Sequence, residues 1–494
     1  MSTNVPRPSE QKLVGWQKGF LLVSLLHLSL ALFYKTVRGL DITASGRSWD
    51  FFWQHLPADL LRTNLLESIW NLHSQPPLYN LYGAFFIRTF PTNYLQAMHY
   101  SNILLGSLLS GMTYVILLSV TRRKRLALLL AIPDLLNPSL ILYEAYVNYT
   151  FLSCFLAVTA VFFLALGASS RRPAHLAAFL LFLNLLILTR SVYHPILLLA
   201  AVPVACLVSR RLRLCLLLSV LLCLLSLGWY TKNYVKFGFF GGSSWYGINL
   251  WKASTANYSR EELEKLTAEG IIDPILFQVI TERKRSFHRP SVFRRFGFAR
   301  TSDIEALSRD DYNNLNIVAI SRLYSSTALR IIRNSPEHHL RNMGSGYLIF
   351  CRPSCRHPSA SYRRMAVNSE IIGFHERIVS EYVQGLRFAE WISERTGAPC
   401  IGSFYFFLIP VSLLLFLATT HRPCFSSLES FGRCVRRNPL MWFLAILIVY
   451  VTLVSCGAEF GENYRFKFLI EPLLWCFFAG VGCQMVEAQG RRRC

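Results

Sequence analysis

Apolar segments recur along most of this chain and are long enough to cross a membrane as helices. Windows such as Ala97–Val120 and Leu214–Tyr230 contain no Asp, Glu, Lys or Arg. Because an α-helix rises 1.5 Å per residue, roughly 20 apolar residues cross a hydrocarbon core about 30 Å thick. The hydrophobic content of 53% also exceeds the roughly 45–50% that is usual for soluble domains. The sequence therefore predicts an all-α polytopic integral membrane protein.

Basic residues gather in short clusters at the ends of the apolar segments. Since positively charged loops are retained on the cytoplasmic side, these clusters predict the topology. The clusters are Arg122–Arg125, Arg171–Arg172, Arg210–Arg213, Arg422–Arg437 and Arg491–Arg493. With an inside N-terminus, about ten spans place every cluster inside: 19–34, 97–120, 126–143, 147–168, 174–189, 191–208, 214–230, 402–420, 440–455 and 468–486. The net charge of +23 thus reflects topology, and no nucleic-acid partner is expected.

This topology divides the chain into three parts. Residues 1–230 form an N-terminal transmembrane module, and its first external loop covers 36–96. Residues 231–400 are mixed in charge and predict a small external domain, and residues 401–494 carry the last spans. The apolar stretch Pro76–Phe90 is short for a crossing, and counting it as one would move the cluster Arg122–Arg125 outside. It is therefore expected to be an interfacial helix.

Asp50 is the candidate general base in the first external loop. It lies between Trp49 and Phe51, so we expect it at the membrane surface, where partial desolvation raises the proton affinity of a carboxylate. The alternative is a helix N-cap or a solvated loop carboxylate, since Asp is favoured just before a helix.

Four further residues of this loop are candidates for the substrate site. Asp59 and Glu67 either contact substrate or form the polar faces of interfacial helices. His73 and Gln75 precede Pro76-Pro77, and either bind a polar ligand or cap the turn.

Three cations are candidates for binding a phosphate group. Arg465 and Lys467 open the last predicted span from the outside, and Arg190 lies at another external span end. A cation at this depth pairs well with a lipid phosphate, and arginine does so through two parallel hydrogen bonds. The alternative is ordinary interfacial snorkelling.

Two stretches carry a resemblance to a known superfamily. His73–Leu81 reads HSQPPLYNL and resembles a Lys-Pro-Pro-Leu region, and Phe237–Leu250 reads FGFFGGSSWYGINL and resembles a Phe-Gly…Ser-Ser…Gly-x-Asn-Leu stretch. With the closing Asn-Tyr-Arg-Phe at 463–466, the chain resembles the GT-C membrane glycosyltransferases. The similar branch contains protein O-mannosyltransferases and bacterial aminoarabinose transferases.

The resemblance implies a glycosyltransferase that uses a polyprenyl- or dolichyl-phosphate-linked sugar and transfers it with inversion to a hydroxyl of a glycan, lipid or protein. It also implies a catalytic Asp in the first external loop, which we assign to Asp50. Many members have Asp-Glu where this chain has Asp50-Phe51, so Asp41 and Asp59 stay open as alternatives. Gln75 stands where Lys is usual, which leaves open a phosphate contact at that position.

The resemblance further implies a site on the periplasmic side of a bacterial inner membrane or the luminal side of the endoplasmic reticulum. No cofactor and no metal site are predicted, although relatives differ in their use of a divalent metal. Two other functions remain open: a secondary transporter, in which a buried charge such as Asp134 binds the substrate, and an inactive GT-C-like scaffold that binds a lipid.

Overall fold

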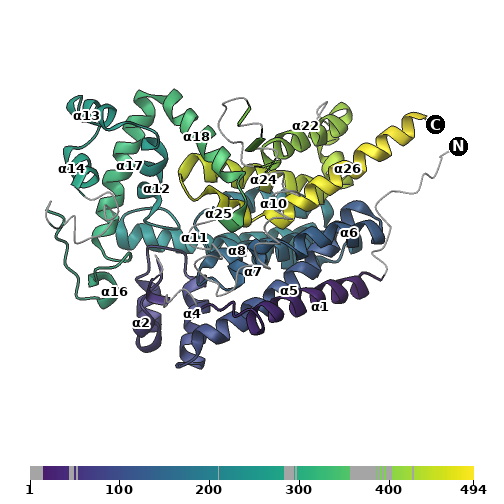
Figure 1. Ribbon diagram of the computed structural model, residues 1–494, viewed down its shortest axis with the longest axis horizontal. Coiled ribbons are helices and arrows are strands. Elements are labelled where there is room, and N and C mark those ends of the chain that lie inside the picture. The colour runs from purple at the N-terminus through teal and green to yellow at the C-terminus, as the bar shows by residue number, and fades with distance from the viewer. Residues whose placement is uncertain are drawn as a thin grey trace.

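The computed structural model describes residues 15–43, 49–51, 54–209, 211–282, 297–356, 403–424 and 428–493, with a few isolated positions between them. Throughout these ranges the regular elements are helices (Figure 1). Their bounds are α1 Trp16–Thr36, η2 Trp49–Phe51, α2 Ala58–Thr63, α3 Leu65–Trp70, α4 Leu78–Thr89, α5 Tyr94–Thr121, α6 Lys124–Leu135, α7 Pro138–Glu144, α8 Tyr149–Ser170, α9 Pro173–Ile187, α10 Ile196–Val208, α11 Leu212–Phe237, α12 Tyr246–Thr255, α13 Arg260–Ala268, α14 Pro274–Glu282, α16 Glu305–Ser308, α17 Asn316–Asn334, α18 Pro336–Phe350, η3 Ser354–Arg356, α22 Tyr405–Cys424, α23 Leu428–Arg437, α24 Pro439–Ala458, α25 Asn463–Phe468 and α26 Glu471–Arg493.

The helices match the predicted membrane segments. In the described part of the chain, five helices are long and apolar enough to cross a membrane, namely α1, α5, α8, α11 and α24, and the bent pair α6–α7 makes a sixth if counted as one span. Three shorter apolar helices, α9, α10 and α22, coincide with further predicted segments, and α26 coincides with the tenth. The chain is a multi-pass all-α membrane protein.

Two predicted spans differ from the structure for local reasons. The segment 126–143 bends by 57°, because Pro133 lacks an N–H to donate and the Asn137 side chain caps a new helix at Ser139. The predicted span 191–208 becomes helical only at Ile196. Before it, the Tyr450 hydroxyl accepts from the His194 N–H and donates to the Val192 carbonyl, which holds residues 188–195 as a loop.

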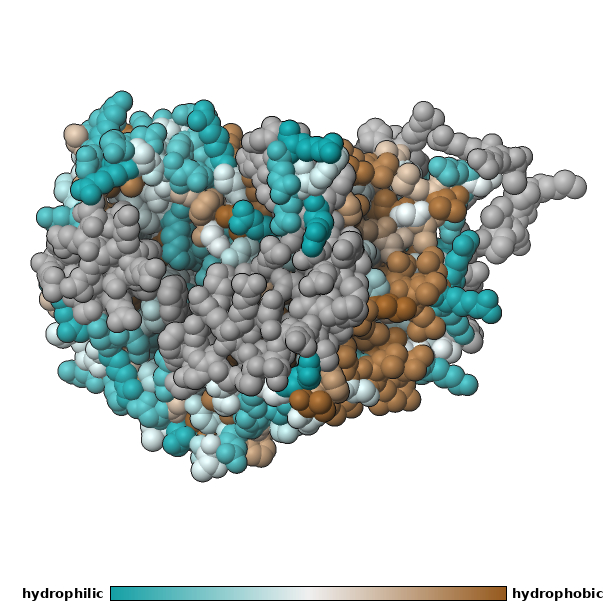
Figure 2. Space-filling model, in the orientation of Figure 1, coloured by the Kyte–Doolittle hydropathy of each residue, from teal (hydrophilic) through white to brown (hydrophobic). Residues whose placement is uncertain are grey.

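The helices run between two chemically different ends of the molecule. The start of α1 and the end of α26 lie at one end in Figure 1, here called the terminal end, and α12, α13, α14 and α17 lie at the other. At the terminal end, α5 and α8 stop at Arg122 and Arg171, each in the left-handed conformation. The face in Figure 2 shows hydrophobic side chains gathered towards the terminal end, with hydrophilic ones over α13 and α17.

A second hydrophobic cluster lies apart from the main helical core. Its buried residues come from α12, α13, α14 and α17, and the 271–273 turn, and include Trp251, Leu276 and Tyr324. Gly247 lets α12 lie directly on α17, where its N–H donates to the Ser321 hydroxyl at 3.0 Å. This cluster falls within 231–400; residues 357–386 lie outside the described ranges, and the domain boundaries stay a prediction.

The predicted interfacial stretch Pro76–Phe90 forms the helix α4, which has 12 residues. At 1.5 Å per residue it is roughly 18 Å long, too short to cross a membrane unaided. Its N-terminus is tied to the α9–α10 loop, because the Leu78 N–H donates to the Leu188 carbonyl at 2.9 Å. This contact brings the segment between α1 and α5 beside the loop that carries Arg190.

Candidate functional site

A cavity of about 990 Å³ opens at the helix ends opposite the basic clusters. That volume is in the range of small-molecule sites in proteins. The segments that meet there are the α1–α5 connection, the start of α8, the α9–α10 loop, the α11–α12 connection, α17 and the α24–α25 turn. Polar lining residues include Gln54, Gln75, Tyr149, Arg190, Tyr246, Lys252, Arg322, Glu459 and Arg465.

Two arginines of the lining, Arg190 and Arg465, lie close together in the cavity wall. Arg190 is only 3% exposed, and its guanidinium carbon lies 4.2 Å from the ring centre of Phe466 and 4.9 Å from that of Tyr149. Arg465 lies 5.8 Å and 5.9 Å from the Tyr149 and Phe466 rings. The two guanidinium groups therefore share the same pair of aromatic rings.

Each of the two arginines has a hydrogen-bond donor that is not used. Within the described structure, Nη1 of Arg190 and Nε of Arg465 are buried and lack an acceptor. Leaving a buried donor unsatisfied typically costs about 1–3 kcal/mol. Glu462 neutralises Arg465 at 2.8 Å, whereas no ion pair is described for Arg190. An anion in the cavity would satisfy these donors.

Other features also make this part of the cavity favourable for an anion. Burial and the nearby charge of Arg465 destabilise the cationic form of Arg190 and lower its pKa to about 10, so an anion beside it would relieve this cost. The helices α8, α10 and α12 begin at the cavity wall with Tyr149, Ile196 and Tyr246, and helix N-termini carry partial positive charge.

Glu459 is the buried carboxylate of the cavity. It follows the last residue of α24, is 6% exposed, and its side chain accepts the Phe460 N–H at 3.2 Å. Burial raises the pKa of Glu459, an effect that the positive charge of Lys252 partly offsets. A carboxylate with raised proton affinity at a cavity wall has the properties of a general base.

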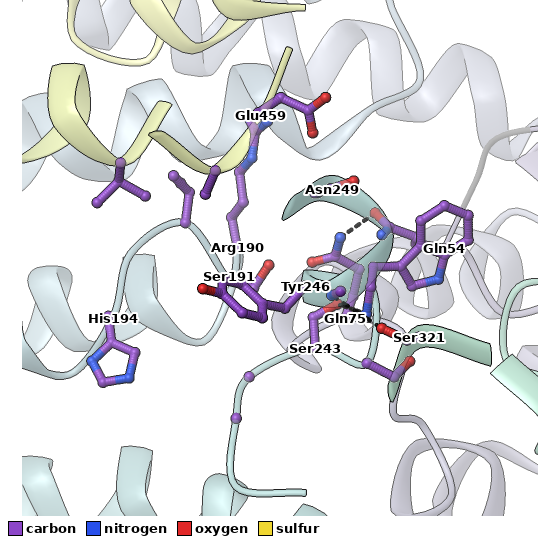
Figure 3. A pocket seen from close by; sticks show the side chains of 18 of the residues that line it. Gln54, Gln75, Arg190, Ser191, His194, Ser243, Tyr246, Asn249, Ser321 and Glu459 are labelled. Atoms are coloured by element: carbon purple, nitrogen blue, oxygen red, sulfur yellow. Dashed lines mark hydrogen bonds between the residues drawn. The ribbon is translucent and has the colours of Figure 1, made fainter. Parts of the chain in front are cut away.

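Gln75 and Gln54 lie together on one side of the cavity, and Figure 3 shows His194 on the opposite side. The side-chain amide of Gln75 donates to Oε1 of Gln54, which also accepts from the Tyr149 hydroxyl at 3.2 Å. The sequence predicted Gln75 as a substrate-site candidate, and the structure places it in the lining.

The segment before Gln75 is held from several distant parts of the chain. Asn313 accepts the backbone N–H groups of His73 and Ser74 at 2.9 Å and 3.1 Å. Ser243 donates to the Ser74 carbonyl at 2.5 Å, and the Ser244 N–H donates to the His73 carbonyl at 2.8 Å. The two stretches that carried the family resemblance are therefore hydrogen-bonded to each other.

Three other predicted site residues of the first loop lie outside the lining. His73 is fully buried and its ring bonds to the Ser244 hydroxyl at 2.8 Å. Asp59 accepts two hydrogen bonds from Arg309, at 3.0 Å and 2.5 Å. Glu67 is exposed and accepts from Asn64. These contacts position the loop.

Asp50 also lies away from the cavity lining. It is exposed, and its Oδ1 accepts the N–H of Ala58, the first residue of α2, at 2.7 Å. Pro57 is the N-cap residue of α2, so Asp50 holds the start of this helix from eight residues away, and its role as the base stays a prediction. The neighbouring residues 44–48 and 52–53 lie outside the described ranges.

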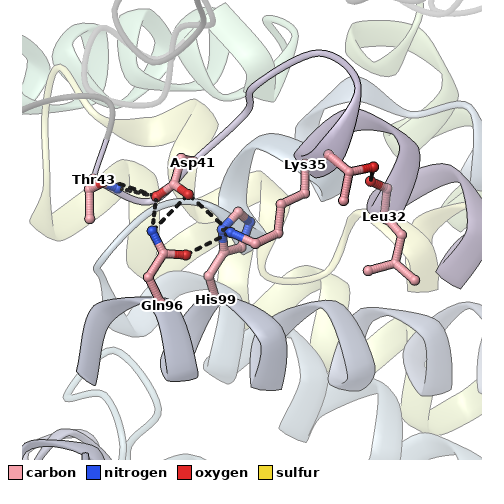
Figure 4. Close-up of polar contacts among 7 residues, drawn as sticks. Leu32, Lys35, Asp41, Thr43, Gln96 and His99 are labelled. Carbon is pink, nitrogen blue, oxygen red and sulfur yellow. Dashed lines mark hydrogen bonds and ion pairs between the residues drawn. The ribbon is translucent and has the colours of Figure 1, made fainter. Parts of the chain in front are cut away.

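Asp41, the other carboxylate left open by the sequence, is part of a polar cluster at the end of α1 (Figure 4). Lys35 pairs with it at 3.0 Å, and Gln96 and Thr43 donate to it. Burial alone would raise the pKa of Asp41, but these hydrogen bonds outweigh burial and hold it well below its usual range. Because its lone pairs are engaged, Asp41 is poorly suited to act as a base.

Lys467 is not brought to the cavity. It is fully buried, pairs with the equally buried Glu471 at 3.4 Å, and lies 4.1 Å from the ring centre of Tyr405. Of the three predicted phosphate-binding cations, the structure thus brings two together, Arg190 and Arg465, and separates the third.

Sequence reasoning missed Glu459, Gln54 and Asn313. A carboxylate directly after an apolar window was a usable signal for Glu459. Gln54 and Asn313 carried no such signal, because their roles come from contacts 21 to 240 residues away in the chain. Among the described residues, no group of three His, Cys, Asp or Glu side chains could hold a metal ion.

No protein-family model matches this chain, and no curated protein matches it. Two crystal structures of ArnT from Cupriavidus metallidurans are similar to it, one in the apo state and one bound to undecaprenyl phosphate. The identities are 15% and 16%, the TM-scores 0.30 and 0.31, and the matches cover 94% and 95% of this chain and 77% and 78% of the other.

Proposed function

We propose that this protein is a membrane glycosyltransferase that transfers a sugar from a polyprenyl- or dolichyl-phosphate donor to an acceptor hydroxyl. The observation that carries the proposal is the pair Arg190 and Arg465, each of which has one buried nitrogen donor without an acceptor beside a large cavity at the ends of membrane helices. A lipid-linked phosphate would accept from these two donors and supply an anion for Arg190, while its tail stays among the apolar helices.

In the proposed reaction, the acceptor oxygen attacks the anomeric carbon and the lipid phosphate leaves from the opposite face, so the configuration inverts. The leaving phosphate is a stable anion and needs positive charge rather than a proton. Arg190 and Arg465 supply this charge, and aligned cationic donors in a water-poor site stabilise a departing anion strongly. The cavity lies at the end opposite the basic clusters, which is the periplasmic or luminal side in the predicted topology.

The attacking hydroxyl also has to lose its proton. Glu459 is the cavity carboxylate suited to accept it, and Asp50 is the candidate that the family resemblance implies. A well-placed general base contributes about 10²–10⁴-fold in rate. Replacement by the matching amide keeps the shape of either side chain and removes the ability to take a proton, so Glu459→Gln and Asp50→Asn separate the two candidates.

The test is a transfer assay on purified protein with radiolabelled polyprenyl-phosphate sugars, alongside direct binding of polyprenyl phosphate. We expect wild type to release or transfer sugar, and the variant that lacks the true base to lose at least about 10²-fold in rate while still binding the lipid. If wild type binds no polyprenyl phosphate and turns over no donor, the proposal fails and the transporter reading gains. If it binds the lipid without turnover of any donor, the protein is a lipid-binding scaffold.

A further inference from the structure

We propose that Gln54 and Gln75 form the subsite for the donor's sugar ring and select an uncharged sugar over an amino sugar or a uronic acid. This inference rests on the proposed function, and it adds the class of sugar.

The position of the two amides beside the arginine pair is the first argument. The Tyr149 hydroxyl donates to Oε1 of Gln54 at 3.2 Å, while the ring of the same tyrosine lies 4.9 Å from the Arg190 guanidinium carbon. Only one side chain therefore separates the amides from the phosphate-binding cations. In a sugar phosphate the ring is joined directly to the phosphate oxygen, so a phosphate at Arg190 places its sugar next to Gln54 and Gln75.

Unused hydrogen-bonding capacity is the second argument. Gln75 is 5% exposed, and its Oε1 is buried without a donor among the residues that the structure describes. A sugar hydroxyl would supply that donor. Because a buried acceptor without a partner is costly, we expect Oε1 of Gln75 to accept a hydrogen bond from the bound substrate.

The backbone conformation of Gln54 is the third argument. Gln54 has a φ of 70°, a left-handed conformation that non-glycine residues rarely adopt. Such strain persists where surrounding contacts impose it and is common at ligand sites. Here it turns the Gln54 side chain towards Gln75 and the cavity (Figure 3).

The charges around the amides determine the class of sugar. The hydrogen bonds described for Gln54 and Gln75 come from uncharged groups, namely each other and Tyr149. The described lining carries four cationic side chains, Arg190, Lys252, Arg322 and Arg465, against two carboxylates, Glu459 and Glu462. An amino sugar would bring a cation into this positive cavity, and a uronic acid would bury a second anion against neutral amides. A charged group placed at the two amides themselves would meet only uncharged hydrogen-bonding groups there, and burying a charge in that way is unfavourable, whereas hydroxyl groups suit amides.

The test compares three polyprenyl-phosphate donors that carry a neutral hexose, an amino sugar or a uronic acid. For wild type we expect kcat/KM for the neutral donor to exceed that for each charged donor by about tenfold or more, since each 1.4 kcal/mol of preference is tenfold. Gln75→Met should lower kcat/KM for the neutral donor by about 10–100-fold, the loss expected for buried hydrogen bonds. Gln75→Glu should narrow or reverse the preference against the amino sugar.

Two controls keep the result interpretable. Gln17→Met removes an exposed amide on α1 and should leave all three rates unchanged. Binding of polyprenyl phosphate, which has no sugar, should be the same in Gln75→Met and wild type if the variant is folded. Efficient use of a charged donor by wild type, or an unchanged preference in Gln75→Glu, overturns this inference and leaves the proposed function standing. Failure of wild type to bind the lipid and use any donor overturns both.

Discussion

Arg465 and Lys467 are two residues apart on the short helix α25, yet their surroundings differ. Arg465 lines the cavity and keeps one donor free, while Lys467 is fully buried against Glu471. Two steps along an α-helix turn the side chain by about 200°, so one cation faces the cavity and the other faces the helix bundle. The charge of Arg465 is therefore available to a ligand, whereas the charge of Lys467 is neutralised inside the protein by Glu471.

The largest effect is expected at the buried pair. Lys467→Met leaves the fully buried Glu471 without its cation, and breaking a buried ion pair in this way costs about 3–5 kcal/mol. Thermal unfolding in detergent should show a strongly lowered midpoint. The double variant Lys467→Met/Glu471→Leu should recover most of this loss, and a single variant as stable as wild type would contradict the assignment.

A smaller effect, on binding instead of stability, is expected at the cavity pair. Arg190→Met or Arg465→Met removes charged hydrogen bonds worth about 1.5–3 kcal/mol each, so affinity for polyprenyl phosphate should fall about 10–100-fold with little change in unfolding. Arg213→Met, an exposed cation at the start of α11, is the matched control. Equal affinity of the control and the cavity variants would refute the phosphate assignment.

The partly exposed pair Lys35–Asp41 is expected to contribute less to the free energy of unfolding, and this contribution should depend on pH. The side chain of Asp41 is 26% exposed, so solvent screening limits its contribution to about 1 kcal/mol. Because its pKa is lowered on folding, this stability is present above the unfolded value of about 4 and is lost as the pH falls below it. Asp41→Asn should remove that part of the pH dependence. Identical acid-unfolding curves for variant and wild type would argue against it.

The smallest effect is expected at the link between Arg309 and Asp59, which joins the first external loop to the segment after α16. Both side chains are substantially exposed, at 30% and 60%, and such pairs are worth roughly 0–1 kcal/mol. A double-mutant cycle with Arg309→Met and Asp59→Asn should give a coupling energy below about 1 kcal/mol. A larger coupling would mean that the loop depends on this contact for its position.

Much of the fold followed from local properties of the chain. Apolar length and basic clusters predicted the ten helical segments, because crossing a hydrocarbon layer imposes a minimum length that can be read residue by residue. The bend at Pro133 and the loop before Ile196 were harder to foresee, since a cap at Asn137 and a hydrogen bond from Tyr450, more than 250 residues away, help to produce them.

The sequence by itself determined the helical membrane architecture, and its basic clusters predict an orientation that stays a prediction. Only the tertiary structure decided that Arg190 and Arg465 meet over shared rings, that Lys467 faces Glu471, and that Gln54 pairs with Gln75. The physical reason is how far apart in the sequence the interacting residues lie. Helix formation and membrane crossing depend on neighbours along the chain, whereas a binding site depends on side chains that packing brings together from distant segments.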